Sequence, residues 1–187
     1  MIQSTRRWPF FPLHKRTLLF FLLAGCTFAH AQKTPILMEL FTSEGCSSCP
    51  PVDQWVAQLD SAQPIAGAQL IVLSEHVDYW DHDGWKDPYS SAALTARQKG
   101  YSTLLGLSDV YTPQVILDGD VEVHPQYGAP TKESLEKAAG LPMLAVRIDG
   151  AALAGGELTG RVQADGSAQK HGGDVYVAIA LDKTLTD

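Results

Sequence analysis

Apolar runs separated by polar breaks divide the middle of the chain into alternating strands and helices. The run at Ile36–Phe41 predicts a strand, and the segment from Pro50 to about Leu59 predicts a helix. Gln69–Ser74 is a nearly continuous apolar run, as is typical of a strand inside a parallel sheet. Ser90 to about Leu105 predicts a second helix, with one of its first two serines as the N-cap. Two strands joined through a helix imply a parallel crossover.

A hairpin, a third helix and a change of pattern follow. Val110–Val123 places Asp118-Gly119 between two apolar stretches, which is a strong hairpin signal. Thr131–Ala139 predicts a helix that Gly140 ends. From Leu141 on, short strands alternate with glycine-rich turns, and we expect them at Leu144–Ile148, Glu157–Gln163 and Val175–Leu181. These strands predict a small β appendage and do not extend the main sheet.

Residues 1–31 have the pattern of a signal peptide. A basic start is followed by the apolar run Leu18–Leu23 and by Ala29-His30-Ala31, a signal-peptidase cleavage pattern. The apolar run is far shorter than the roughly 20 residues that a bilayer requires, which argues against a transmembrane anchor. We therefore expect an exported protein, periplasmic or secreted, with cleavage after Ala31. Leu23–Cys26 also resembles the bacterial lipoprotein box, so a lipid anchor at Cys26 is the alternative.

Charge narrows the classes of partner. The whole chain carries a net charge of −7, and removal of the four basic residues in 1–31 lowers it to −11. An acidic body of this kind argues against nucleic acid or an anionic membrane as the partner. The apolar content of 45% is that of an ordinary globular protein.

The sequence Cys46-Ser47-Ser48-Cys49 is the strongest chemical signal in the chain. It lies between the first predicted strand and the first predicted helix, whose N-terminus favours a thiolate over a thiol. Once Cys26 has left with the signal peptide, these two thiols can pair only with each other or with another molecule. An inert structural disulfide is one alternative. Half of a metal site is another, and it would need histidines such as His76, His82 and His124, since a second cysteine pair is absent from the sequence. We expect no metal and no cofactor.

The order of these elements, together with Cys46–Cys49 and Thr112-Pro113, resembles that of a thioredoxin-like domain over residues 34–140. Three stretches resemble, more narrowly, a family of exported bacterial thioredoxin-like proteins classed as a domain of unknown function. They are Glu39–Pro51, His76–Asp81 and Gly84–Pro88. The resemblance implies an α/β fold of thioredoxin type. Residues 141–187 would then be a β-rich appendage that is incomplete relative to the family.

The resemblance also implies roles for single residues. Cys46 would be the attacking thiol and Cys49 the resolving thiol of a redox-active disulfide, with Ser47 and Ser48 donating hydrogen bonds to the first sulfur. Pro113 would be cis and lie against the cysteines, and Thr112 would offer its backbone to a bound peptide. The implied function is an exported thiol–disulfide oxidoreductase that acts on protein or small-molecule thiols.

A polar and aromatic loop follows the second strand, on the sheet edge that carries the cysteines. His76 or Asp78 would carry protons and tune Cys46, while Trp80 would face the substrate. Alternatively, the aromatic residues pack the loop and its acids cap backbone groups, and Asp87-Pro88 forms a turn. A non-enzymatic binding module with a permanent disulfide and a copper-handling protein of thioredoxin fold are the alternative functions.

Overall fold

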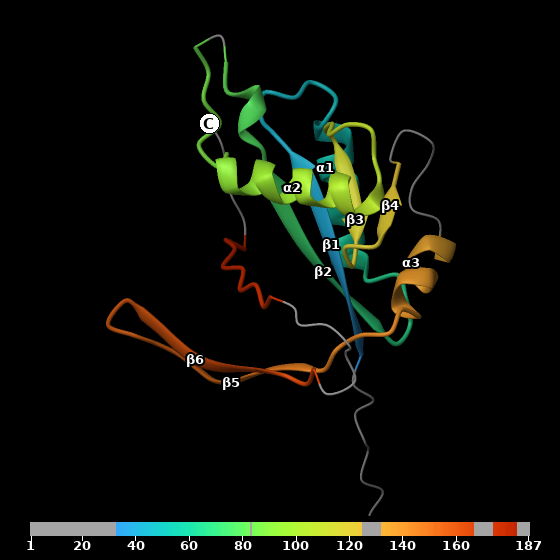
Figure 1. The fold of residues 1–187 in the computed structure, drawn as a ribbon, viewed down its shortest axis with the longest axis vertical. Coiled ribbons are helices and arrows are strands. Elements are labelled where there is room, and N and C mark those ends of the chain that lie inside the picture. Colours follow the sequence, from blue (N-terminus) through green and yellow to red (C-terminus); the bar gives the residue numbers. More distant parts are fainter. Residues whose placement is uncertain (1–32, 83, 125–131, 167–173, 183–187) are drawn as a thin grey trace, which may run out of the picture. The chain divides into compact units, whose positions relative to one another are not determined.

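The computed structural model describes residues 33–82, 84–124, 132–166 and 174–182. All its helices and strands lie in the second of the chain's two units, Gln32–Asp187 (Figure 1). In chain order they are β1 (Thr34–Thr42), α1 (Pro50–Ala62), β2 (Ala68–His76), the 3-10 helix η1 (Asp78–Trp80), α2 (Ala92–Leu105), β3 (Gln114–Leu117), β4 (Val121–Val123), α3 (Lys132–Ala139), β5 (Val146–Ala154) and β6 (Glu157–Ala164).

The predictions for the N-terminus lie outside this description. The signal peptide at residues 1–31 and the lipid alternative at Cys26 fall in a part of the chain that the structure does not describe. Among the described residues, the helices all fall short of the length and apolar character needed to cross a membrane.

A four-stranded mixed sheet, in the order β2-β1-β3-β4, is the framework of the fold. β1 and β2 are parallel, as the predicted crossover requires, and β3 runs antiparallel to both β1 and β4. Asp118, Gly119 and Asp120 connect β3 to β4, and the first two have φ values of 48° and 69°. The Asp120 N–H donates to the Leu117 carbonyl at 3.0 Å and Leu117 pairs with Val121, so the predicted hairpin is confirmed, with a three-residue connection.

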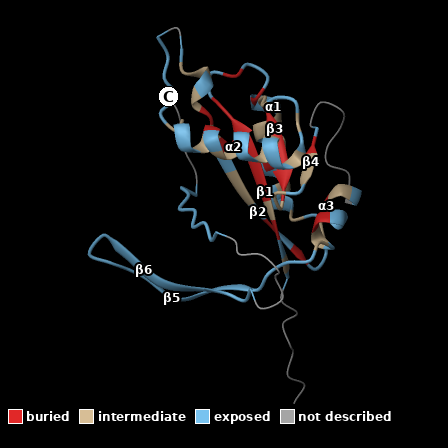
Figure 2. Cartoon of the chain, in the orientation of Figure 1, coloured by how far each residue is buried: buried red, intermediate tan, exposed pale blue. Residues whose placement is uncertain are grey.

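Strand β1 divides the core because its side chains alternate between the two faces of the sheet. Ile36, Met38 and Leu40 are fully buried on the face covered by α1 and α3. Phe41 points to the opposite face, where it packs with Ile116 under α2. Figure 2 shows the buried residues concentrated on the central strands, with α2 crossing in front of them.

A buried charged cluster lies at the centre of the α2 face. Glu39 of β1 is fully buried, and its two carboxylate oxygens accept hydrogen bonds from Arg97 Nε and from the Tyr101 hydroxyl, each at 2.5 Å. Glu75 of β2 lies beside this pair, with Arg97 Nε 3.5 Å from its Oε1 atom. Burial, reinforced by the negative charge of Glu39, raises the pKa of Glu75 to about 8. The α2 face therefore combines a small apolar cluster with paired charges.

Ser91 is the N-cap of α2, as one of the two serines was predicted to be. Its side chain accepts a hydrogen bond of 3.1 Å from the backbone N–H of Ala93. We expect Ser91→Ala to lower the free energy of unfolding by about 1 kcal/mol, because this donor loses its partner. Urea denaturation would measure the change. Ser61→Ala, at an exposed position of α1, is the control, with an expected change within about 0.5 kcal/mol.

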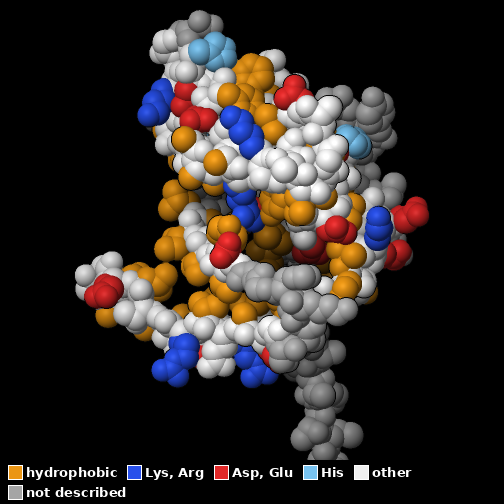
Figure 3. All heavy atoms as spheres, viewed as in Figure 1, with side chains coloured by type: hydrophobic (Ala, Val, Ile, Leu, Met, Phe, Trp, Pro, Cys, Tyr) orange, Lys and Arg blue, Asp and Glu red, His pale blue; other side chains and the backbone are white. Residues whose placement is uncertain are grey.

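In the C-terminal part, two of the three predicted strands form, and they are separate from the main sheet as expected. β5 and β6 form a separate two-stranded antiparallel sheet, and every residue of both strands is exposed. Apolar side chains such as Leu153, 74% exposed, gather along this hairpin (Figure 3). The strand predicted at Val175–Leu181 is wrong, because residues 174–182 form neither helix nor strand. A strand needs a neighbour for its backbone groups, and none of the described strands pairs with this segment.

Candidate functional site

Cys46 and Cys49 form a disulfide in the turn between β1 and α1. The S–S distance is 2.08 Å and the Cα–Cα distance is 5.4 Å. Cys46 is only 2% exposed, and Cys49 is fully buried. The loop after β2 packs on the cysteine turn. A Cβ added at Gly45 would lie 3.1 Å from the Cβ atom of Trp80. Only a glycine fits this approach without displacing Trp80.

The backbone at the start of α1 offers no N–H group to the sulfur of Cys46. Cys49 is the N-cap, and Pro50 and Pro51 occupy the first helical positions without N–H groups. The next two N–H groups, of Val52 and Asp53, both donate to the carbonyl of Cys49, at 2.8 and 3.0 Å. These four positions therefore supply no backbone hydrogen bond to the sulfur of Cys46. The helix dipole remains the contribution of α1 to a thiolate at this end.

The two serines between the cysteines are exposed. The Ser48 hydroxyl lies 3.5 Å from Cys46 Sγ, which is within hydrogen-bonding range for sulfur. Among the described residues, Ser47 makes no hydrogen bond to either cysteine, so only one of the two expected serine contacts is present in the disulfide form.

The Thr112–Pro113 peptide bond is cis. Because Phe41 pairs with Gln114, this dipeptide lies next to the end of β1, from which the chain continues into the cysteine turn. The Thr112 hydroxyl accepts a hydrogen bond of 2.7 Å from the indole N–H of Trp80. Trp80, expected to face the substrate, is thus half-buried and joins the loop after β2 to the segment before β3.

His76, at the end of β2, is held by a residue that the sequence reasoning assigned to a turn. Asp87 is only 1% exposed, and its Oδ2 atom lies 2.7 Å from His76 Nδ1. The same oxygen accepts hydrogen bonds from the Glu44 N–H at 2.8 Å and from the Ser43 hydroxyl at 3.3 Å. Burial alone would raise the pKa of Asp87, but the hydrogen bonds from Glu44 and His76 outweigh it, so the pKa is lowered. Asp87 therefore connects His76 to the turn that leads into Cys46.

Asp78, the other expected proton carrier, is engaged elsewhere. Its Oδ1 atom accepts a hydrogen bond of 2.6 Å from the Thr95 hydroxyl, and its N–H donates to the same hydroxyl at 3.0 Å. Both contacts tie η1 to α2. Sequence alone does not distinguish His76 from Asp78 as the proton carrier. In the structure, only His76 is connected to the cysteine turn, through Asp87.

Asp53 is a further titratable group at this end of the sheet, and the sequence reasoning missed it. Thr42 pairs with His76 across the parallel strands, and the Thr42 hydroxyl donates a hydrogen bond of 2.8 Å to Asp53 Oδ1. Burial raises the pKa of Asp53 even though this hydrogen bond and the nearby His76 act in the opposite direction. Its position in the first turn of α1, four residues after Cys49, was the available signal.

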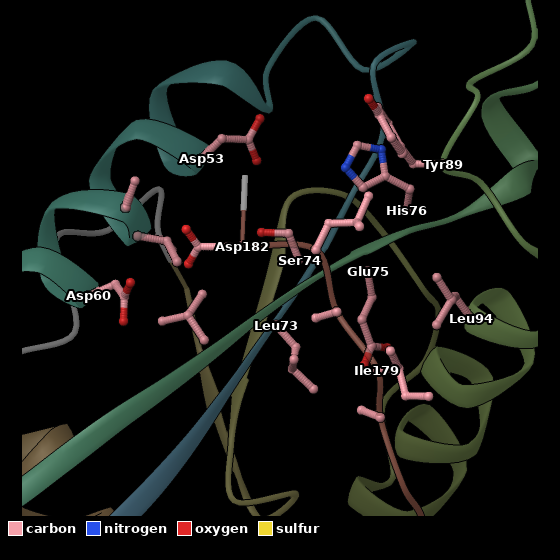
Figure 4. A pocket seen from close by; sticks show the side chains of 16 residues that line it. Asp53, Asp60, Leu73, Ser74, Glu75, His76, Tyr89, Leu94, Ile179 and Asp182 are labelled. Carbon is pink, nitrogen blue, oxygen red and sulfur yellow. The ribbon is translucent and has the colours of Figure 1, made fainter. Parts of the chain in front are cut away.

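Asp53 and His76 also line one pocket of about 420 Å³ at the edge of β2. Figure 4 shows both side chains directed into its upper part, Asp53 from α1 and His76 from β2, with Tyr89 beside the imidazole. The Tyr89 ring meets the His76 ring edge to face, with 5.4 Å between the centroids. The pocket therefore has a titratable end next to the cysteine turn and an apolar continuation that includes Leu73 and Leu94.

The histidines considered as metal ligands do not come together. Among the described residues, no group of three or more His, Cys, Asp or Glu side chains is arranged to hold a metal ion. His76 is bonded to Asp87, His82 stacks on Trp80, and His124 contacts Tyr111. This arrangement gives the copper alternative no support.

Fold and site together define an α/β protein with a mixed four-stranded sheet, whose cysteine pair forms a disulfide at a strand-to-helix turn. The chain belongs to the family described as "Protein of unknown function (DUF1223)", whose model matches residues 37–187. It is also similar to a protein of Agrobacterium tumefaciens known from a crystal structure, with 36% sequence identity and a TM-score of 0.51. That match covers 64% of this chain and 52% of the other, so the chain spans about half the length of this relative. Among curated proteins, none matches the chain.

Proposed function

We propose that the protein is an exported thiol–disulfide oxidoreductase of thioredoxin-like fold, in which Cys46 and Cys49 alternate between dithiol and disulfide. The observation that carries the proposal is the Cys46–Cys49 disulfide at the start of α1, on the sheet end that also holds the cis Thr112–Pro113 bond. A bond within so short a loop constrains the unfolded chain little, so a purely stabilising role explains it less well. The substrates would be thiols of proteins or small molecules, after export and cleavage at Ala31.

The proposed reaction consists of two successive thiol–disulfide exchanges. A substrate thiolate attacks Cys46 Sγ, the bond to Cys49 breaks, and the electron pair leaves with the sulfur of Cys49, which takes up a proton. A second substrate thiolate then attacks the mixed disulfide and releases Cys46. The substrate is oxidised to a disulfide, and the protein is reduced to the dithiol.

The surroundings of the two sulfurs favour Cys46 as the one that is attacked. Its neighbours Gly45 and Ser47 are exposed, whereas Cys49 is enclosed as the N-cap of α1. Ser48, within reach of Cys46 Sγ, would stabilise the released thiolate.

A redox titration tests the proposal. We expect the full chain, equilibrated in glutathione buffers of graded potential, to change between disulfide and dithiol in a single two-electron transition. Because a structural disulfide in an exported protein resists the glutathione pool, a midpoint above about −300 mV would support exchange. Trapping of free thiols and mass spectrometry would count the reduced cysteines. A chain that stays oxidised across the whole range would contradict the proposal.

The second candidate is a non-enzymatic binding module with a permanent disulfide and the loop around Trp80 as its contact surface. The observation that favours it is burial, since the two cysteines are 2% and 0% exposed. This candidate predicts that the folded protein resists dithiothreitol and is reduced only in denaturant. It also predicts that a partner remains bound when Cys46 is replaced by serine.

A further inference from the structure

We propose that Gln98 of α2 is a positioning residue for the disulfide exchange. Its side-chain amide holds the chain on both sides of the cis Thr112–Pro113 bond, and it thereby fixes the Thr112 backbone groups to which a peptide thiol would bind. The inference rests on the proposed function of the cysteine pair, and it adds to the site a residue that the sequence reasoning did not consider.

Gln98 is a fully buried polar residue in the middle of α2. Its Nε2 atom donates hydrogen bonds to the Tyr111 carbonyl at 2.8 Å and to Gln114 Oε1 at 2.9 Å. Tyr111 directly precedes Thr112, and Gln114 directly follows Pro113. One amide nitrogen therefore bridges the two ends of the cis dipeptide.

The orientation of this amide follows from its partners. A backbone carbonyl only accepts hydrogen bonds, so the nitrogen of Gln98 has to face Tyr111. The fully buried Gln114 presents its oxygen to Gln98, and its Nε2 atom donates to Glu122 Oε1 at 2.7 Å. The Tyr111 hydroxyl donates to the same carboxylate oxygen at 2.9 Å. These four hydrogen bonds close a ring that connects α2, β3 and β4, and both neighbours of the dipeptide belong to it.

The oxygen of Gln98 indicates that the site uses this residue for its donors. Among the described residues, Gln98 Oε1 is buried without a hydrogen-bond partner, which costs free energy. A hydrophobic side chain of the same length would avoid this cost, but it would leave the Tyr111 carbonyl and the Gln114 oxygen without their donor. The two bonds to the segment around Thr112 therefore account for the presence of an amide here.

The segment held in this way lies at the cysteine end of the sheet. Gln114 pairs with Phe41 in the last part of β1, from which the chain continues into the cysteine turn. The indole N–H of Trp80 donates to the Thr112 hydroxyl at 2.7 Å, and the same tryptophan packs on Gly45, next to Cys46. A peptide bound at Thr112 would thus lie at the same end of the sheet as the disulfide.

Thr112 itself offers backbone groups to a substrate. It is half-buried, and none of the described residues hydrogen-bonds to its backbone N–H or carbonyl. Such groups pair readily with an extended peptide, which supplies the complementary N–H and C=O groups. Peptide thiols are therefore the substrates whose binding should depend on Gln98. A small thiol such as dithiothreitol has no peptide backbone and should not depend on it.

The test compares two thiols in the reduction of the oxidised full chain: a reduced peptide that contains two cysteines, and dithiothreitol. Gln98→Met removes both donors and keeps the length of the side chain. We expect the peptide concentration that gives half the maximal rate to rise about tenfold, since misplacing a binding group by about 1 Å can cost up to about 100-fold. The maximal rate with the peptide and the rate with dithiothreitol should stay within about twofold of wild type. The midpoint potential should not change.

Ser91→Ala is the matched control, because it weakens the N-terminus of the same helix while the contacts of Gln98 remain. This variant should keep the wild-type peptide concentration at half-maximal rate. An equal rise in both variants would mean that a loosened α2 causes the effect, and it would overturn the inference. Equal losses with the peptide and with dithiothreitol in Gln98→Met would overturn it as well.

Tyr111→Phe decides the matter if Gln98→Met does not fold. It removes one hydroxyl of the ring at a half-buried position, so the peptide concentration at half-maximal rate should rise about threefold, with an unchanged rate for dithiothreitol. An unchanged peptide concentration in the variant that is measured would refute the role of Gln98 and leave the oxidoreductase intact. A wild-type disulfide that neither thiol reduces would instead refute the proposed function itself, and the role of Gln98 with it.

Discussion

Replacing Cys46 by serine is expected to abolish disulfide exchange, leaving only the rate of the free thiols in the assay. The attacked sulfur is then missing, and Ser48 or Cys49 cannot take its place because a thiolate–disulfide reaction needs the bonded pair. The fold should survive, since a loop this short contributes no more than about 2 kcal/mol to stability. The measurement is reduction of a small disulfide, or oxidation of a dithiol, by purified protein at equal concentrations.

Cys49→Ser is the second variant, and it tests whether Cys46 is the sulfur that forms the mixed disulfide. It keeps the Cys46 thiol but removes the resolving sulfur. When a disulfide such as oxidised glutathione is offered, the Cys46 thiolate attacks it and one thiolate leaves, so a mixed disulfide should accumulate at Cys46. Mass spectrometry of the unreduced protein would detect it. Retained turnover in Cys46→Ser, or the absence of any mixed disulfide in Cys49→Ser, would favour the binding module with its structural disulfide.

The elements that could be predicted from the sequence are those encoded by local patterns. The apolar run of β1 and the capping serine of α2 depend on residues within one turn or one strand of each other. Asp118-Gly119 predicts its turn because both residues tolerate positive φ. The segment Val175–Leu181 shows where this reasoning fails, since an apolar run becomes a strand only when another strand pairs with it.

The parts of the candidate site that escaped prediction depend on contacts between distant residues. Asp87 precedes a proline, and its local signal is that of a turn. Its contact with Glu44, 43 residues earlier, gives it a role at the cysteine turn. Trp80 likewise reaches the cysteine turn from a distant segment, where it packs on Gly45. Periodicity and spacing carry no information on which loop covers which turn.

Contacts between distant residues also decide the role of Glu39 in the core. Glu39 is a polar residue within the apolar strand β1, and its partner Arg97 follows 58 residues later in the sequence. We expect Arg97→Met to lower the free energy of unfolding by about 3–5 kcal/mol, because a fully buried carboxylate then loses its cation. The Tyr101 hydroxyl would still donate to Glu39, but a neutral hydrogen bond compensates a buried charge only in part. Urea denaturation of the oxidised protein, followed by tryptophan fluorescence, would measure the loss.

Two further variants distinguish the contribution of the Glu39–Arg97 ion pair from that of the packing of the Arg97 side chain. Arg147→Met removes an exposed arginine of β5 and should change the free energy of unfolding by less than about 0.5 kcal/mol. The double variant Glu39→Leu with Arg97→Met removes both charges, so it should recover most of the loss, since the penalty comes from the uncompensated carboxylate. If the double variant were as unstable as the single one, packing of the arginine stem would be the main contribution of Arg97. Recovery would instead mean that the buried charge of Glu39 makes the packing of α2 against β1 depend on Arg97.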